Sequence, residues 1–331
     1  MARGDRRQDG RTVRGLVGGT DVAAQGTPAT PATPVSGAAR ADLRPQVRSQ
    51  VPSQVRSQVP SQVRSQVRSI TSRDNPALRL VRRLVEHPTA YRSAGQVWLE
   101  GEHLCRAVLS RGWRPARALV SQAGWADAGL AALASAAPAI DVMPDALFGA
   151  LGGMPSPASI GFLVDLPAAP QVLATQAAVL LDRVQDAGNV GSILRTAAAM
   201  GVPQVLATVG TAALWSHKVL RAGMGAHFAL RLVEGLGPDD LDRLAVPLMA
   251  GSSHAASALT ETELPDPCVW VLGHEGQGVS DDLLRRCAGT VRIPQPGGEE
   301  SLNVAAAAAI CLYESVRRRQ AASTASSASA D

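Results

Sequence analysis

Hydrophobic and polar positions alternate in short blocks between residues 70 and 165. The first block predicts a helix with Pro76 in its first turn and either Ser72 or Asp74 as its N-cap. Its apolar face repeats at helical spacing and consists of Leu78, Leu80, Val81, Leu84 and Val85. Strands are predicted at 96–99, 118–121, 140–143 and 160–164, and helices at 102–110, 128–136 and 144–151. This alternation predicts a small α/β domain over residues 70–165.

A second alternating series occupies residues 177–320. Strands are predicted at 179–184, 204–207, 229–232, 247–250, 269–272 and 290–293. Helices are predicted at 190–200, 212–221, 239–244, 281–286 and 302–319, with Ser301 as the cap of the last one. Because strands that alternate with helices form sheets covered on both faces, a mostly parallel sheet is expected here. Residues 166–176, with Pro167 and Pro170, are expected to be a linker.

The two ends of the chain lack this pattern. Residues 1–69 are rich in Arg, Ser, Gln and Pro and finish in a four-residue repeat of the form VRSQ or VPSQ. One valine in four residues buries too little surface to offset the entropy cost of ordering, so a disordered tail is predicted. It is either a passive extension or an arginine-bearing arm that attracts phosphate. Residues 321–331 are predicted to form a second disordered tail.

Charge is distributed unevenly. The chain of 331 residues has room for two domains and a net charge of +4. Residues 1–69 contain eleven arginines and four aspartates, net +7, which leaves 21 basic and 24 acidic residues, net −3, for the remainder. Any nucleic-acid contact made by the folded part is therefore expected to come from local basic patches.

Several classes of protein are disfavoured by composition. The four cysteines are widely spaced and follow no signal-peptide pattern. Neither disulfides nor a zinc site are therefore expected, and the protein is expected to be cytoplasmic. No apolar run reaches the roughly 18–20 residues that span a bilayer, so no membrane association is expected. No His, Cys and Asp cluster suggests a metal site.

Three polar, glycine-containing loops follow strands of the second series, where ligands bind in open parallel sheets. The first, residues 181–197, contains Asn189 and Arg195. An arginine near the start of a helix can bind a phosphate or stabilise a developing alkoxide, although this loop taken alone favours an ordinary surface arginine on an alanine-rich helix. The third, residues 293–304, contains Ser301 and Asn303, and this segment taken alone favours a role as only the N-cap and first-turn residues of the last helix.

The second loop, residues 271–280, runs from a buried strand into three glycines that allow a ligand to approach the backbone closely. It has neither the spacing of the dinucleotide-binding motif nor the GK[ST] of a phosphate loop, so NAD and ATP are disfavoured. His274 is either a base or structural. Glu275 either binds a ribose or orients Arg195, or is a solvated loop charge.

In this order and at these separations, the three loops resemble the signature motifs of the SpoU-type, or TrmH-like, RNA ribose 2′-O-methyltransferases of the SPOUT class. Residues 221–226, RAGMGA, resemble a further segment of the family. Ala187 and Gly223 replace a proline and a serine that are common in the family. Residues 70–76 and 99–104 resemble parts of the small RNA-binding domain that precedes the catalytic domain in rRNA-modifying members, although 99–104 could be only a strand-to-helix turn.

The resemblance implies a C-terminal sheet with a deep trefoil knot and a dimer. It implies that S-adenosylmethionine is bound by Gly273, Gly278, Ile293, Gln295 and Leu302. It also implies that Arg195 assists deprotonation of the ribose hydroxyl or binds the adjacent phosphate, and that Asn189, Glu275, Ser301 and Asn303 hold the substrate and the loops in place. The expected substrate is structured RNA, with 23S-type rRNA favoured over tRNA because of the upstream domain. The alternatives are a tRNA ribose methyltransferase and a non-catalytic RNA-binding or ribosome-assembly factor of the same fold.

Overall fold

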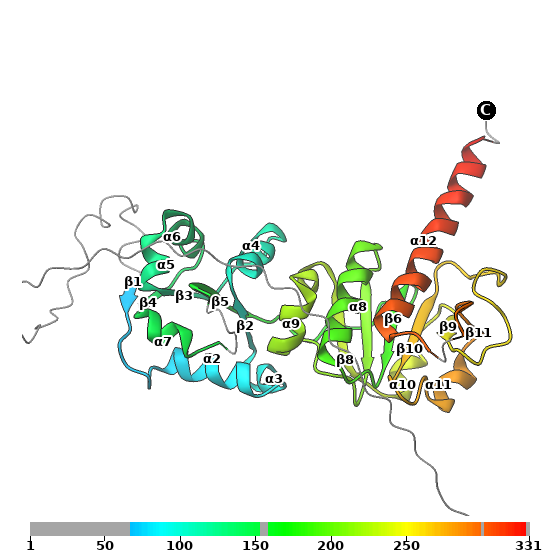
Figure 1. Cartoon of the computed structure of the whole chain (residues 1–331), viewed down its shortest axis with the longest axis horizontal. Coiled ribbons are helices and arrows are strands. Elements are labelled where there is room, and N and C mark those ends of the chain that lie inside the picture. Colours follow the sequence, from blue (N-terminus) through cyan, green and yellow to red (C-terminus); the bar gives the residue numbers. More distant parts are fainter. Residues whose placement is uncertain (1–66, 153–157, 299–300, 329–331) are drawn as a thin grey trace, which may run out of the picture. The chain divides into compact units, whose positions relative to one another are not determined.

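A computed structural model describes residues 67–152, 158–298 and 301–328 (Figure 1). The proposed tail of residues 1–69 lies outside this description up to residue 66. Within the described residues, no helix combines the length and the hydropathy needed to cross a membrane. The helices and strands build two sheets, one from residues 67–165 and one from residues 178–291.

The first sheet has five strands in the order β1-β4-β3-β5-β2. They are β1 (Val67–Ser69), β2 (Gln96–Glu100), β3 (Arg117–Ser121), β4 (Ile140–Met143) and β5 (Ile160–Asp165). The antiparallel strand β5 lies between β2 and β3, and the remaining pairs are parallel. The helices are α2 (Pro76–Glu86), α3 (Ala90–Ala94), α4 (Glu102–Ser110), α5 (Gln122–Ala126), α6 (Ala128–Ala134) and α7 (Asp145–Gly149).

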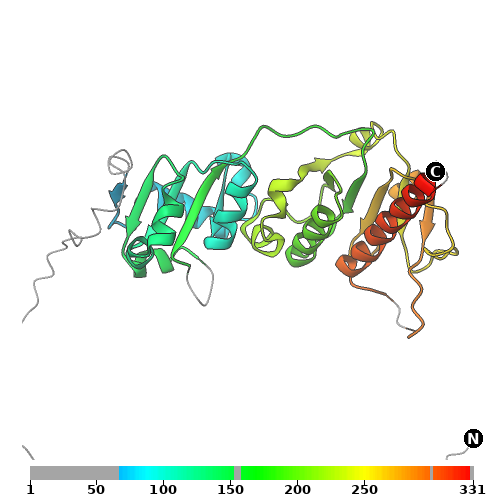
Figure 2. The ribbon, with the colours of Figure 1, turned by 90° about the horizontal axis from the view of Figure 1, so that it is seen from above.

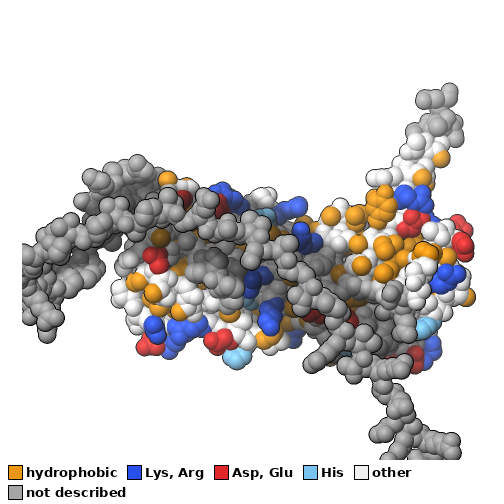
Figure 3. Space-filling model, in the orientation of Figure 1, with side chains coloured by type: hydrophobic (Ala, Val, Ile, Leu, Met, Phe, Trp, Pro, Cys, Tyr) orange, Lys and Arg blue, Asp and Glu red, His pale blue; other side chains and the backbone are white. Residues whose placement is uncertain are grey.

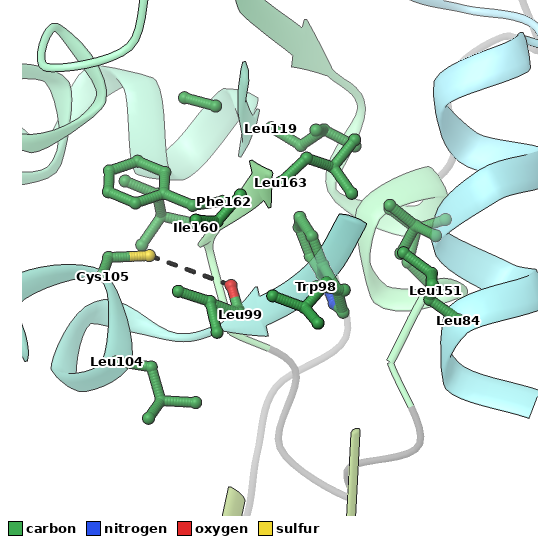
Figure 4. Close-up of a cluster of buried hydrophobic side chains, with 14 of the residues drawn as sticks. Leu84, Trp98, Leu99, Leu104, Cys105, Leu119, Leu151, Ile160, Phe162 and Leu163 are labelled. Atoms are coloured by element: carbon green, nitrogen blue, oxygen red, sulfur yellow. Dashed lines mark hydrogen bonds between the residues drawn. The ribbon is translucent and has the colours of Figure 1, made fainter. Parts of the chain in front are cut away.

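A buried cluster of large side chains holds this sheet and its helices together. Figure 4 shows Trp98 and Leu99 of β2 beside Ile160 and Phe162 of β5, with the thiol of Cys105 on α4 directed at the Leu99 carbonyl oxygen, 3.9 Å away. The four hydrophobic side chains named are at most 1% exposed. Burial on this scale contributes about 1.5–3 kcal/mol for each large apolar side chain, which explains why the alternating pattern predicted these strands correctly.

Four details of this half differ from the sequence-based expectation. Residues 67–69, which were expected to belong to the disordered tail, form an edge strand that pairs with β4. The N-cap of α2 is Asn75, whose Oδ1 accepts a hydrogen bond from the Ala77 N–H, and neither Ser72 nor Asp74. The helix expected at 128–136 is observed as α6, which ends at Ala134 and is capped by Asp127, and the short helix α5 before it was not predicted. The short helix α3 was not predicted.

The second sheet has six strands in the order β11-β9-β10-β6-β7-β8, and all of these pairs are parallel. They are β6 (Ala178–Asp182), β7 (Gln204–Thr208), β8 (Arg231–Leu236), β9 (Leu248–Gly251), β10 (Val269–Gly273) and β11 (Gly289–Val291). The helices are α8 (Ala187–Ala199), α9 (His217–Gly223), α10 (Pro238–Leu241), α11 (Asp281–Arg286) and α12 (Val304–Ala328), with a 3-10 turn at Ala226–Ala229. Figure 2 shows α8 and α12 side by side along this sheet. The α/β class and the mostly parallel sheet are therefore confirmed.

Local capping explains where this half departs from expectation. Asp186 accepts a hydrogen bond from the Asn189 N–H and starts α8 three residues earlier than predicted. Ser216 caps α9, so the helix expected at 212–221 begins at His217. The strand expected at 229–232 begins at Arg231, after the 3-10 turn. The predicted C-terminal tail is wrong for residues 321–328, which continue α12.

Candidate active site

The carboxyl ends of β6 and β10 mark the point where the strand order of the sheet reverses. From β6 the chain continues to β7 and β8 on one side, and then crosses to β9 and β10 on the other. Strands β6 and β10 are neighbours, with Leu272 opposite Leu181 and Gly273 opposite Asp182. Ligands of open parallel sheets bind at such reversal points, because the loops after the two strands diverge there. The first and second polar loops therefore meet at one edge of the sheet.

The loop after β10 is a tight turn that requires glycine at both ends. The His274 N–H donates to the Gly278 carbonyl at 3.0 Å, and the Gly278 N–H donates to the His274 carbonyl at 2.8 Å. A Cβ at Gly273 would lie 2.1 Å from the backbone of Gly278 and Val279, and Gly278 itself has φ +69°. Backbone packed this closely leaves no room for a side chain.

His274 has a structural role within this turn. Its Nδ1 accepts hydrogen bonds from the backbone N–H groups of Gly276 at 3.0 Å and Gln277 at 3.2 Å. An imidazole nitrogen that accepts from two donors is not free to accept a substrate proton. Of the two interpretations that the sequence left open for His274, the geometry favours the structural one.

Glu275 ties the second loop to the first. Its carboxylate accepts hydrogen bonds from the backbone N–H groups of Gln185 at 3.2 Å and Asp186 at 3.1 Å, and from Asn189 Nδ2 at 3.0 Å. Partial burial raises the pKa of Glu275, but the bonds from Asn189 and from the two backbone groups more than offset this and leave the pKa below its ordinary value. The side chain therefore stays a carboxylate and holds the first loop, so it is not simply a solvated charge.

Asn189 and Asn303 extend this connection to the third loop. Asn303 Nδ2 donates to Asn189 Oδ1 at 2.9 Å. The Asn303 Oδ1 accepts from the backbone N–H groups of Ala305 at 2.9 Å and Ala306 at 3.3 Å, so Asn303 caps α12. The prediction that Ser301 caps this helix was wrong. One line of hydrogen bonds, from Glu275 through Asn189 to Asn303, joins all three loops.

Arg195 and Ser301 stand apart from this line. Both are exposed, and within the described residues the structure gives neither side chain a hydrogen bond or an ion pair. Arg195 lies on α8 one turn after Gly191, where the helix packs so closely against Ala222 that a Cβ on the glycine would approach it to 2.4 Å. The guanidinium donors of Arg195 are therefore available to a ligand.

Asp182, a residue that the sequence analysis missed, anchors the far end of the second loop. This carboxylate is 3% exposed and accepts a hydrogen bond from the Ser280 N–H at 2.7 Å. Its other oxygen accepts from Arg183 Nε at 3.2 Å. Because buried carboxylates need partners of this kind, an aspartate that ends the hydrophobic run of residues 178–181 was a usable signal.

Arg183 is the second residue that was missed. It has φ +58°, and its backbone N–H donates to the hydroxyl oxygens of Thr208 and Thr211, each at 3.1 Å. Its Nη1 donates to Gln277 Oε1 at 3.0 Å, which adds another connection between the first and second loops. A left-handed backbone is uncommon for a residue with a side chain, so no sequence signal indicated this conformation.

The five residues assigned to cofactor binding differ in their surroundings. Gly273 and Gly278 form the tight turn, and Ile293 packs against the same hydrophobic cluster as Leu272. The side-chain oxygen of Gln295 is buried and has no hydrogen-bond partner in the described part of the chain, whereas Leu302 is 39% exposed. Because a buried acceptor without a donor is costly, Gln295 suits a ligand that presents an N–H or O–H group.

A cavity of about 380 Å³ lies elsewhere on this sheet. It is lined by residues near the amino ends of β9 and β11, among them Leu244, Leu248 and Cys287. The polar loops lie at the carboxyl ends of the strands, so this cavity is not part of the candidate site. Among the described residues, no group of three or more His, Cys, Asp or Glu side chains could hold a metal ion.

Comparisons with known proteins relate this chain to RNA methyltransferases. The profile of the SpoU rRNA Methylase family matches residues 176–313. A protein of Synechocystis named as an uncharacterized tRNA/rRNA methyltransferase is 32% identical over 282 residues, which are 77% of this chain and 96% of the relative. The 23S rRNA (guanosine(2553)-2′-O)-methyltransferase of Bacillus subtilis is 35% identical over 170 residues, 50% of this chain and 68% of the relative. The crystal structure of an AdoMet-bound rRNA methyltransferase from Sinorhizobium meliloti is 26% identical, with a TM-score of 0.66 over 76% of this chain and 98% of that one.

Proposed function

The chain belongs to the SpoU rRNA methylase family, and we propose that it transfers the methyl group of S-adenosylmethionine to a ribose 2′-hydroxyl of 23S-type ribosomal RNA. The observation that carries this proposal is the line of hydrogen bonds from Glu275 through Asn189 to Asn303. It joins the three loops whose sequences resemble the family motifs, at the reversal point of the sheet. The rRNA substrate is supported by the names of relatives such as the Bacillus subtilis 23S rRNA enzyme.

The cofactor is S-adenosylmethionine, which supplies a methyl group on a positively charged sulfur that is a good leaving group. Gly273 and Gly278 would let the cofactor approach the backbone of the second loop. The buried oxygen of Gln295 fits a donor group of the cofactor, since it has no partner within the described residues. Ile293 and Leu302 would supply apolar contact, with Ile293 held by the core.

The protein's main task in this reaction is positioning. A ribose hydroxyl is a weak nucleophile, and holding two reactants in line accounts for about 7–11 kcal/mol of the barrier in favourable cases. We assign to Arg195, whose donors are free, the binding of the adjacent phosphate or help with removal of the hydroxyl proton. Ser301 would contact the substrate, while Glu275, Asn189 and Asn303 keep the three loops in register.

We further propose the domain organisation and assembly that the family implies. Residues 67–165 would be an RNA-binding domain, residues 166–176 a linker, and residues 177–328 a catalytic domain with a trefoil knot. The reversal of strand order between β6 and β10 supports this proposal, because the knotted loops of the family lie at that edge. The enzyme would act as a homodimer in the cytoplasm and without a metal.

The test is transfer of labelled methyl from S-adenosylmethionine to rRNA and to tRNA, both from cells that lack this protein. A 2′-O-methylated ribose resists alkaline cleavage, so the modified position can be mapped. Resistance at one rRNA ribose is the expected result. Label that enters tRNA alone would refute the rRNA assignment, and tight RNA binding without any transfer would refute the enzymatic one.

A further inference from the structure

Four arginines lie together on and beside α2, which is remote in sequence from the three loops of the candidate site. They are Arg73, Arg79, Arg82 and Arg83, and we call them the α2 arginine surface. Three of them are exposed and Arg82 is half-buried. Figure 3 shows blue side chains over the region of α2 on the face in view, with red ones beside them.

Direct contacts make this surface continuous. Arg82 and Arg83 lie three and four positions after Arg79, on the same side of the helix. Arg82 Nη2 donates to the backbone carbonyl of Arg73, which brings the preceding loop alongside the helix. Arg83 Nη2 donates to Ser93 Oγ at 2.6 Å. Both guanidinium groups are thus held in place by uncharged acceptors and keep most of their five donors free.

The four arginines also lack acidic partners, unlike several arginines elsewhere in the described residues. The structure gives none of them an ion pair, whereas Arg243, Arg285 and Arg286 each pair with an aspartate. Residues 73–86 contain these four arginines and two acids, net +2, while the chain beyond residue 69 has net −3. The positive charge is therefore concentrated locally and remains uncompensated.

The support beneath the surface is rigid. The opposite side of α2 buries Leu78, Val81 and Leu84, each at most 5% exposed, and Asn75 caps the first turn. Charges on a packed and capped helix lose little additional entropy when a ligand binds, which favours affinity. Arginine forks fit phosphate oxygens through paired hydrogen bonds.

We propose that the α2 arginine surface binds the phosphate backbone of the substrate RNA at a place other than the methylated ribose. The inference rests on the proposed function for the identity of the partner. The contact supplies affinity and orientation without selecting a base, because phosphates carry no sequence information. It also explains how a chain whose folded part has net negative charge holds RNA.

The test compares two double variants that each remove two positive charges from the full-length protein. Arg79→Gln with Arg83→Gln alters the surface. Arg243→Gln with Arg285→Gln alters two side chains that are 71% and 70% exposed, one in the turn after α10 and one on α11. Affinity for a fluorescently labelled RNA stem-loop is measured by anisotropy across a series of salt concentrations. The slope of log K against log salt should fall by about 1 for each arginine–phosphate interaction that the substitutions remove.

We expect a smaller slope for the α2 variant alone, with restoration by Arg79→Lys and Arg83→Lys. In methyl transfer, the same variant should raise the KM for rRNA and leave kcat unchanged. Equal slopes for the wild type and the α2 variant, or an equal reduction in both double variants, would overturn the proposal. Loss of binding to anionic vesicles with unchanged RNA binding would also overturn it. Because the binding assay needs no methyl transfer, an inactive wild type would refute the enzymatic function and leave this test intact.

Discussion

The tight turn after β10 allows a sharp test of the candidate site through Gly273. In a Gly273→Ala variant the new Cβ would lie 2.1 Å from the backbone of Gly278 and Val279. The turn would have to open by the difference between 2.1 Å and the 3.4 Å at which ordinary contact begins, about 1.3 Å. Since the neighbours are backbone atoms, no side chain can rotate away, and the displacement falls on the loop assigned to the cofactor.

The expected loss follows from this displacement. Misplacement of reacting groups by about 1 Å costs up to ~100-fold in rate, so kcat/KM should fall by about two orders of magnitude. Overpacking also costs about 1–3 kcal/mol of the free energy of unfolding. Methyl-transfer kinetics with varied S-adenosylmethionine would measure the first effect, and thermal or denaturant unfolding the second.

Two other glycines allow the effect of backbone strain to be separated from the effect of position near the site. Gly278 and Gly201 have φ +69° and +71°, and neither would place a Cβ within 4 Å of another group. Alanine at either position should therefore cost the same ~1–2 kcal/mol for a left-handed backbone. Gly278 belongs to the turn, whereas Gly201 follows the far end of α8, about 18 Å along the helix from Asn189.

We expect Gly278→Ala to raise the KM for S-adenosylmethionine, and Gly201→Ala to lower stability by a similar amount with unchanged kinetics. Wild-type kinetics in Gly273→Ala would refute the assignment of the turn to the cofactor. Equal kinetic losses in Gly278→Ala and Gly201→Ala would attribute the effect to instability and refute it as well.

Three further predictions concern single side chains. Arg195→Ala should lower kcat by ~10²–10⁴-fold with unchanged cofactor affinity and melting temperature, and unreduced turnover would remove Arg195 from the mechanism. Asp182→Ala leaves the Ser280 N–H without its acceptor, so the free energy of unfolding should fall by ~1–3 kcal/mol and the KM for S-adenosylmethionine should rise. Asp182→Asn, which keeps an acceptor oxygen, should recover both values. An unchanged KM in Asp182→Ala would contradict the anchoring role. Burial lowers the pKa of His227 to about 4 although its Nε2 donates to the Leu214 carbonyl. As pH falls, the unfolded chain therefore takes up the proton on His227 at a higher pH than the folded chain does. The free energy of unfolding should drop by ~3 kcal/mol between pH 6.5 and pH 4, as measured by denaturant titrations. A His227→Gln variant should lose this pH dependence.

The sequence by itself determined the class of fold and the segments that form the site. Runs such as residues 178–182 and 269–273 are buried strands because their hydrophobic side chains must leave water whichever strand lies beside them. It also supplied the residue types at Asn189, Glu275 and Asn303, since these belong to short contiguous motifs. Short elements such as β1 and α3 carried no such signal, because three to five residues are too few to show a period.

Only the tertiary structure decided which of these residues meet. The bond between Asn189 and Glu275 spans 86 positions, that between Asn303 and Asn189 spans 114, and the bond between Asp182 and Ser280 spans 98. Hydrophobic periodicity reports whether a position is buried, but not which distant group lies opposite it. Which residues meet across the reversal point depends on the spatial order of the strands in the sheet. That order is a property of the whole packed chain.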